Sequence, residues 1–86
     1  DAKNEIDIAA LDPEGKNLIL GECKYWKEPV GLNVLHALEA KACDVAWERD
    51  RRKVWYVLFS ISGFSDELRN HAATRDDLLL IDDGER

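Results

Sequence analysis

The segment Val54–Ile61 (VWYVLFSI) constrains the fold most, because it is almost continuously apolar. Such a run is typical of a central strand covered on both faces, since a strand with one solvated face alternates apolar and polar residues. Gly63 ends the run. A short helix is predicted from the N-cap residue Ser65 to about Ala73, and Leu78–Asp82 (LLLID) is predicted as the final strand. A strand–helix–strand unit of this kind should cross over right-handed, with parallel strands.

The first part of the chain predicts a β-hairpin. Glu5–Leu11 (EIDIAAL) has the pattern of a short strand, with Ile6 and Ile8 on one face. The loop Asp12–Asn17 (DPEGKN) has proline early and glycine late, which is turn chemistry. Leu18–Tyr25 (LILGECKY) is predicted as the second strand, apolar where it begins and charged where it ends.

The longest helical pattern extends over Leu32–Trp47, after Pro29 and Gly31. Its apolar residues recur at helical spacing and form one stripe: Leu35, Leu38, Ala42 and Val45. The charged stretch Arg49–Lys53 ends the helix. The predicted order is therefore strand, strand, helix, strand, helix, strand. This order predicts an α/β fold, with a mixed sheet that begins with the hairpin.

The chain has 86 residues, which suits one small domain over 1–86. Hydrophobic residues make up 45% and charged residues 35%, a globular balance. Residues 1–4 (DAKN) are turn-like although no strand precedes them, so we expect a fragment of a larger protein. No apolar run approaches the length of a transmembrane helix, and the first residues do not resemble a secretion signal.

Two cysteines argue against a disulfide framework. Cys23 falls in a predicted strand and Cys43 in the predicted long helix, so both are expected to be buried, reduced thiols. Reduced thiols suit a cytoplasmic location. Neither cysteine has a zinc-ligand spacing to His36 or His71, so the sequence predicts no zinc site and no role for the histidines.

The formal net charge of −6 counts against tight nucleic-acid binding, because phosphate contacts dominate that affinity. The charges are distributed unevenly, however. Acidic residues gather towards the C-terminal end: Asp76, Asp77, Asp82, Asp83 and Glu85. Arg49–Lys53 is mostly basic, and Lys24 and Lys27 form another basic group. A local surface that contacts phosphate therefore remains compatible with the composition.

The pattern Glu-x-Lys occurs at Glu14–Lys16, Glu22–Lys24 and Glu39–Lys41. The first lies in the predicted turn and the third inside the long helix. Only the second ends an apolar strand, where alternation puts its glutamate and lysine on the same face. The pattern has little weight by itself, so its place in the hairpin decides its meaning.

The expected register of the hairpin brings two acids together. If Leu11 pairs with Leu18 across the loop, Asp7 pairs with Glu22. Paired residues share a face, with Cβ atoms roughly 4.5–5.5 Å apart. Like charges at that spacing destabilise a hairpin unless a cation lies between them. A slip of one residue would separate the two acids.

Two neighbouring carboxylates suit a hard divalent cation such as Mg²⁺, which prefers oxygen ligands and keeps several waters. Such an ion can lower the pKa of a bound water and neutralise charge on a phosphate. Lys24 would then hold the attacking water or the phosphate. Glu5 should pair with Lys24, and an ordinary cross-strand contact explains it as well as a site role does. The alternative for Asp7, Glu22 and Lys24 is a solvated face with a surface ion pair.

These residues resemble the core of the PD-(D/E)XK nuclease superfamily, the restriction-endonuclease-like fold. More narrowly, residues 4–8 (NEIDI), 21–25 (GECKY) and 27–31 (KEPVG) followed by a helix are similar to the nuclease-like domain at the C-terminus of archaeal-type ATPases. The first half of the chain carries the resemblance, and the second half matches in element order. That superfamily usually has a helix and a strand before the hairpin, and this chain has neither.

The resemblance implies a metal-dependent nuclease. Asp7, Glu22 and the backbone carbonyl of Cys23 would bind Mg²⁺ or Mn²⁺, and Lys24 would position or activate water. The implied partners are nucleic acid, with DNA favoured, and an ATPase module in the parent chain. The sequence contains no phosphate-binding glycine loop, so ATP hydrolysis would depend on that module.

Other residues near the motif have simpler explanations. Lys41 lies at the edge of the apolar stripe and could lean towards the site, although a solvated or snorkelling lysine is the better explanation. Tyr25 and Trp26 could contact a base, whereas Trp47 and Trp55 are expected in the core. The residues of Arg49–Lys53 could touch phosphates, although a charged helix-to-strand connection is commoner.

Two further functional hypotheses stay open. The chain could be a catalytically silent regulatory or nucleic-acid-sensing domain with a nuclease fold. It could also be a structural dimerisation module, in which the edge of the sheet pairs with a second copy and gives a homodimer.

Overall fold

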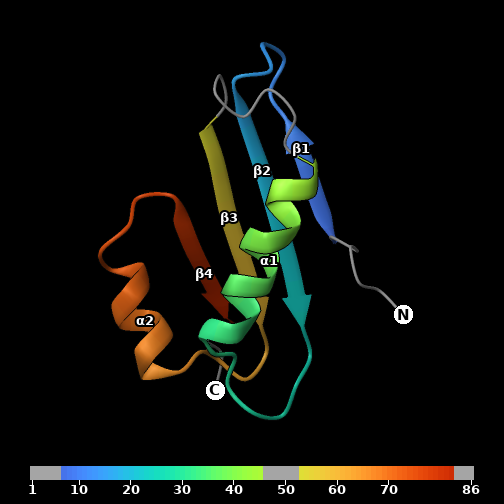
Figure 1. The fold of residues 1–86 in the computed structure, drawn as a ribbon. Coiled ribbons are helices and arrows are strands. Elements are labelled where there is room, and N and C mark those ends of the chain that lie inside the picture. Colours follow the sequence, from blue (N-terminus) through green and yellow to red (C-terminus); the bar gives the residue numbers. More distant parts are fainter. Residues whose placement is uncertain (1–6, 46–52, 83–86) are drawn as a thin grey trace.

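The computed structural model describes residues 7–45 and 53–82, and Figure 1 shows their arrangement. The order of elements is the predicted one. The strands and helices are β1 (Ile8–Leu11), β2 (Asn17–Lys24), α1 (Leu32–Val45), β3 (Lys53–Ser60), α2 (Asp66–Ala72) and β4 (Leu78–Asp82). Their bounds agree with the predicted ones to within a few residues. Glu5, Ile6, Trp47 and residues 49–52 lie outside the described part.

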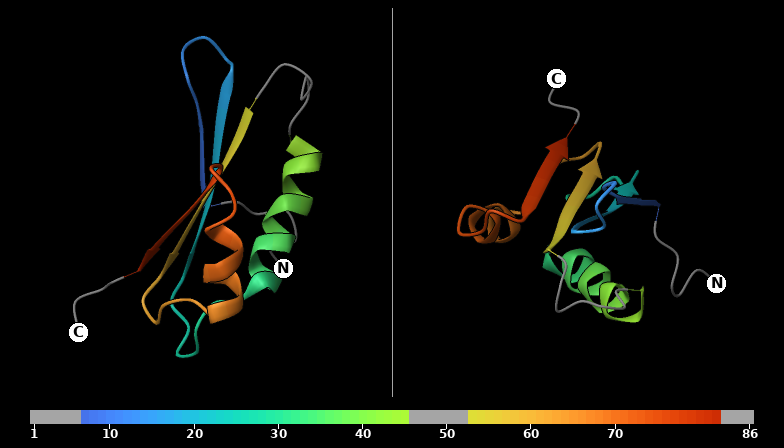
Figure 2. Two further views of the ribbon diagram at one scale, coloured as in Figure 1. Left: turned by 90° about the vertical axis from the view of Figure 1, so that its left-hand side faces the viewer. Right: turned by 90° about the horizontal axis from the view of Figure 1, so that it is seen from above.

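The four strands form one mixed sheet in the order β1-β2-β3-β4. The β1 and β2 pair is antiparallel, whereas β2 pairs with β3, and β3 with β4, in parallel. Each parallel connection contains a helix, and both helices cover the same face of the sheet (Figure 2). The predicted mixed α/β sheet is therefore confirmed.

The hairpin loop is closed by its first residue. The Asp12 carboxylate accepts hydrogen bonds from the Lys16 backbone N–H at 2.8 Å and from the Asn17 side-chain amide at 2.9 Å. The bond from Asn17 is the main reason that the pKa of Asp12 lies below its ordinary value. Gly15 has a φ of 73°, which glycine adopts without strain. This turn sets the register, and Leu11 pairs with Leu18 as predicted.

The hydrophobic core lies between the sheet and the two helices. Leu35 and Leu38 of α1 are fully buried, as the predicted stripe requires. They pack with Leu20 of β2, Leu58 of β3 and Leu68 of α2, which are also fully buried. In a chain this small, these contacts hold α1 across the strands and so position everything that α1 presents to the sheet.

The start of α2 follows the predicted capping chemistry. The Ser65 hydroxyl accepts a hydrogen bond from the Leu68 backbone N–H at 3.1 Å. Asp66 and Glu67 follow in the first turn, where the helix dipole favours negative charge. The helix then places Leu68 in the core.

The second face of the sheet differs from the prediction. Alternate residues of β3, namely Trp55, Val57 and Phe59, point away from the helices and are only half-buried. Within residues 7–45 and 53–82, no helix covers this face (Figure 2). Leu79 and Ile81 of β4 share it and are exposed. We call this side of the sheet the open face. The expectation that β3 is covered on both faces, with Trp55 in the core, is wrong for the described residues.

Both cysteines also differ from the prediction. Cys43 is exposed, because it lies next to the buried Ala42 on α1 and points off the apolar stripe. Cys23 is half-buried on the open face, since it alternates with Glu22 along β2. The two thiols are free. No helix in the described part of the chain is long and apolar enough to span a membrane.

Candidate metal and phosphate site

The Glu-x-Lys motif lies at the end of β2, on the face that the helices cover. Alternation along the strand gives Leu18, Leu20 and Glu22 the same direction, and all three are buried. Glu22 is 8% exposed. The strand ends at Lys24, so the charged end of β2 follows its apolar start as the sequence indicated.

Two ammonium groups contact one oxygen of Glu22. Lys24 Nζ lies 3.0 Å from Glu22 Oε2, and Lys41 Nζ lies 3.6 Å from the same atom. The other carboxylate oxygen, Oε1, is buried and has no hydrogen-bond partner among the described residues. An interior carboxylate oxygen without a partner is costly, and most such atoms in proteins are satisfied by a protein group, an ordered water or an ion.

Asp7 lies just before β1 and contacts the strand that carries the motif. Its Oδ2 atom accepts a hydrogen bond from the Cys23 backbone N–H at 2.8 Å. The described ladder ends with Ile8 opposite Gly21, and one further step in the same register would place Asp7 opposite Glu22. The side chain of Asp7 is therefore anchored beside the residue that follows Glu22.

The carboxylates of this site could hold Mg²⁺ only if water and backbone oxygens supplied the remaining ligands. No three His, Cys, Asp or Glu side chains gather as a metal cluster in residues 7–45 and 53–82. Mg²⁺ needs fewer, since it is usually held by one or two carboxylates and retains several waters. The unpartnered Oε1 of Glu22 supplies one such oxygen, and it is the observation that makes the residues fit.

Lys41 joins the site, which the sequence offered only as the lesser alternative. A solvated ammonium group was favoured, but the side chain is only 14% exposed and lies beside Glu22. The helical spacing contained the signal, because Lys41 comes between Leu38 and Ala42 on the side of α1 that packs on the sheet. Which strand residue it would meet depended on how α1 crosses the sheet.

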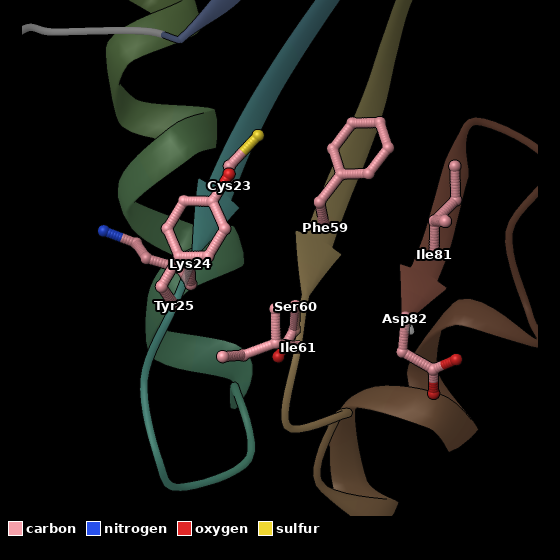
Figure 3. Close-up of a pocket in the computed structure, with 8 residues that line it drawn as sticks. All are labelled: Cys23, Lys24, Tyr25, Phe59, Ser60, Ile61, Ile81 and Asp82. Carbon is pink, nitrogen blue, oxygen red and sulfur yellow. The ribbon is translucent and has the colours of Figure 1, made fainter. Parts of the chain in front are cut away.

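A shallow hollow opens on the other side of the sheet, next to the motif (Figure 3). Cys23, Phe59 and Ile81 lie in a row across β2, β3 and β4 at its base. Tyr25 lies at its edge and is 75% exposed. Trp26, which follows, is 40% exposed, and Lys24 Nζ lies 5.0 Å from its ring centroid. An aromatic surface thus adjoins the charged one.

A second charged cluster lies just before β4. Arg75 contacts Glu39 of α1 at 2.9 Å and Asp77 at 2.8 Å. The hydrogen bond from Arg75 holds the pKa of Asp77 below its ordinary value, and Asp77 in turn raises the pKa of Arg75. These contacts join α1 to the segment before β4, so we call this cluster the structural clamp. Lys53, the described end of the predicted basic run, similarly pairs with Asp76 at 3.2 Å.

Comparison with known proteins adds no identification. Scans against family models, curated proteins and solved structures found no match for this chain.

Proposed function

We propose that this chain is a nuclease-like domain of the PD-(D/E)XK superfamily that hydrolyses phosphodiester bonds at Asp7, Glu22 and Lys24. The observation that carries the proposal is the buried, unpartnered Oε1 atom of Glu22 beside two lysines. The mixed sheet would then be part of a restriction-endonuclease-like core. By the resemblance of its motifs, the chain would belong C-terminal to an ATPase module in its parent protein.

The residues divide the chemistry between them. Asp7, Glu22 and the Cys23 carbonyl would hold Mg²⁺ or Mn²⁺. When bound, the ion would neutralise charge on the phosphate and lower the pKa of a water ligand. Lys24 has a side chain that is 25% exposed, so it can donate a hydrogen bond to water or to a phosphate oxygen while it remains near Glu22.

Nucleic acid, with DNA favoured, is the proposed substrate. The net charge of −6 opposes its binding overall, so affinity must come from a local surface. Lys24 provides positive charge there, and the exposed rings of Tyr25 and Trp26 provide stacking surface beside it. The proposed location is the cytoplasm, which suits the free thiols of Cys23 and Cys43.

Substitution of Lys24 by alanine tests the proposal. We expect wild-type protein to cleave DNA with Mg²⁺ or Mn²⁺ and to stop when the metal is chelated. Lys24→Ala should lower the cleavage rate by roughly 100-fold or more, in the range found for positioned catalytic groups. Lys16→Ala is the matched control, because it changes an exposed lysine of the Glu-x-Lys pattern in the turn. Equal rates for both variants would contradict the proposal.

The exposed Tyr25 and Trp26 favour one alternative, a nucleic-acid-sensing domain that binds without cutting. Such a domain would bind single strands by stacking, and its affinity would fall steeply as salt rises. Salt-dependent binding without any metal-dependent cleavage would select this alternative.

A further inference from the structure

The packing of the hydrophobic core fixes the position of Lys41. Its neighbours Leu38 and Ala42 are buried against the sheet, so the α1 face that carries Lys41 is held over β2. The ammonium group reaches Glu22 Oε2 at 3.6 Å, and the side chain is 14% exposed. Lys24 approaches the same oxygen from the strand at 3.0 Å. Two separate elements thus bring positive charge to one atom.

The two carboxylate oxygens of Glu22 have different surroundings. Both lysines converge on Oε2, which leaves Oε1 without a partner. The geometry therefore suits two ligands of opposite charge, a cation at Oε1 and an anion beside the Lys41 ammonium group.

We infer that Lys41 is a positioning residue of this site, which competes with a divalent cation for Glu22 and holds a phosphate oxygen once the cation is bound. The inference rests on the proposed function and deepens it, because it names the group that binds the phosphodiester. The long stem of lysine permits the change of partner, since it carries a compact charge on a flexible chain. Lys24 is then left to act on water.

A purely structural role for Lys41 predicts different behaviour. If Lys41 only neutralises buried Glu22, its loss should weaken folding and leave metal affinity and substrate affinity unchanged or both impaired. If it competes with the cation, its loss should strengthen metal binding. If it also holds phosphate, the same loss should weaken binding of DNA. Tighter metal binding together with weaker DNA binding would therefore indicate the proposed role, and any other combination a structural one.

The test uses the whole chain with Lys41→Met, which keeps the length of the stem and removes the charge. Mn²⁺ binding without nucleic acid is measured by titration calorimetry, and DNA cleavage gives kcat and KM. We expect Mn²⁺ to bind about threefold to tenfold more tightly, KM for DNA to rise roughly tenfold, and kcat to change much less. Lys41→Arg should restore KM. Lys27→Met, at an exposed lysine near the motif, should change neither quantity.

The outcomes separate this inference from the proposed function. If wild-type protein cleaves DNA and Lys41→Met has unchanged or weaker Mn²⁺ affinity, or an unchanged KM, the inference alone fails. If folded wild-type protein neither binds Mn²⁺ nor cleaves, the proposed function fails and the inference fails with it. If Lys41→Met does not fold, Lys41→Gln replaces it in the same measurements, with the same expected signs.

Discussion

The two faces of the sheet are made by the same strands and yet behave as different surfaces. On the covered face, Leu58 of β3 is fully buried under the helices. On the open face, Val57 and Phe59, its neighbours in the sequence, are only half-buried. An apolar strand therefore does not determine its own burial. The helices that pack on it decide which side becomes the core and which side stays accessible.

The candidate site lies on the covered face, and this explains its electrostatics. Glu22 is held between β2 and α1, where water has little access, so its contacts with Lys24 and Lys41 are stronger than those of a solvated ion pair. Asp82, at the end of β4, forms a more exposed pair with Arg69 at 3.1 Å. Pairs of that kind contribute little. Burial therefore distinguishes the proposed site from ordinary surface charge.

Leucine truncation on the two faces gives the largest expected difference. Leu58→Ala should lower the free energy of unfolding by about 3 kcal/mol, because it leaves a cavity under the helices. Leu79→Ala removes the same atoms from a side chain that is 55% exposed, so the loss should stay below about 1 kcal/mol. Urea denaturation of both variants measures the two values. Similar losses would mean that the open face is buried in solution.

Gly21→Ala should show that the open face does not accept a larger side chain at every position. A Cβ atom at this position would lie 3.1 Å from the Val57 carbonyl oxygen and 3.2 Å from the Ile8 Cβ. Since the nearest neighbour is backbone, we expect a loss of about 1–2 kcal/mol despite the missing helix cover. Thermal unfolding beside Ala10→Gly, on the same face of β1, provides the comparison. A stabilised Gly21→Ala variant would contradict the predicted crowding.

The clamp at the edge of the covered face should give the smallest effect, visible as pH dependence. Because Arg75 lowers the pKa of Asp77, the pair contributes stability above the ordinary carboxyl value of 3.8 and loses it as pH falls through the lowered value. Asp77→Asn should cost about 0.5 kcal/mol at pH 7 and almost nothing at pH 2. Unfolding by urea at both pH values measures the difference. An equal cost at the two pH values would show that the ionised Asp77 carboxylate does not stabilise the fold through Arg75.

The fold was predictable where local chemistry agreed with the tertiary packing. The Asp12–Asn17 loop has one good way to close, and it sets the pairing of Leu11 with Leu18. The stripe of Leu35 and Leu38 identified the buried side of α1 correctly. Cys43 was misjudged because a residue next to the stripe points away from the core by about a quarter of a helical turn. Trp55 was misjudged because its apolar ring suggested burial, whereas its position in β3 places it on the open face.

The candidate site was predictable only in part, for a similar reason. Alternation on β2 placed Glu22 and Lys24 on one side, which needs no knowledge of the helices. The contact of Lys41 with Glu22 joins residues that are far apart in the sequence, and it depends on the crossing of α1 over β2. The unpartnered Oε1 atom is likewise visible only when all neighbouring groups are in place.

The sequence by itself determined the order of the elements, the hairpin register and the motif that ends β2, because turn chemistry and side-chain periodicity act over short distances. The tertiary structure alone decided which face of the sheet is covered and that Lys41 of α1 meets Glu22. Helix packing is selected by the fit of many side chains at once, and no short stretch of the chain encodes that fit.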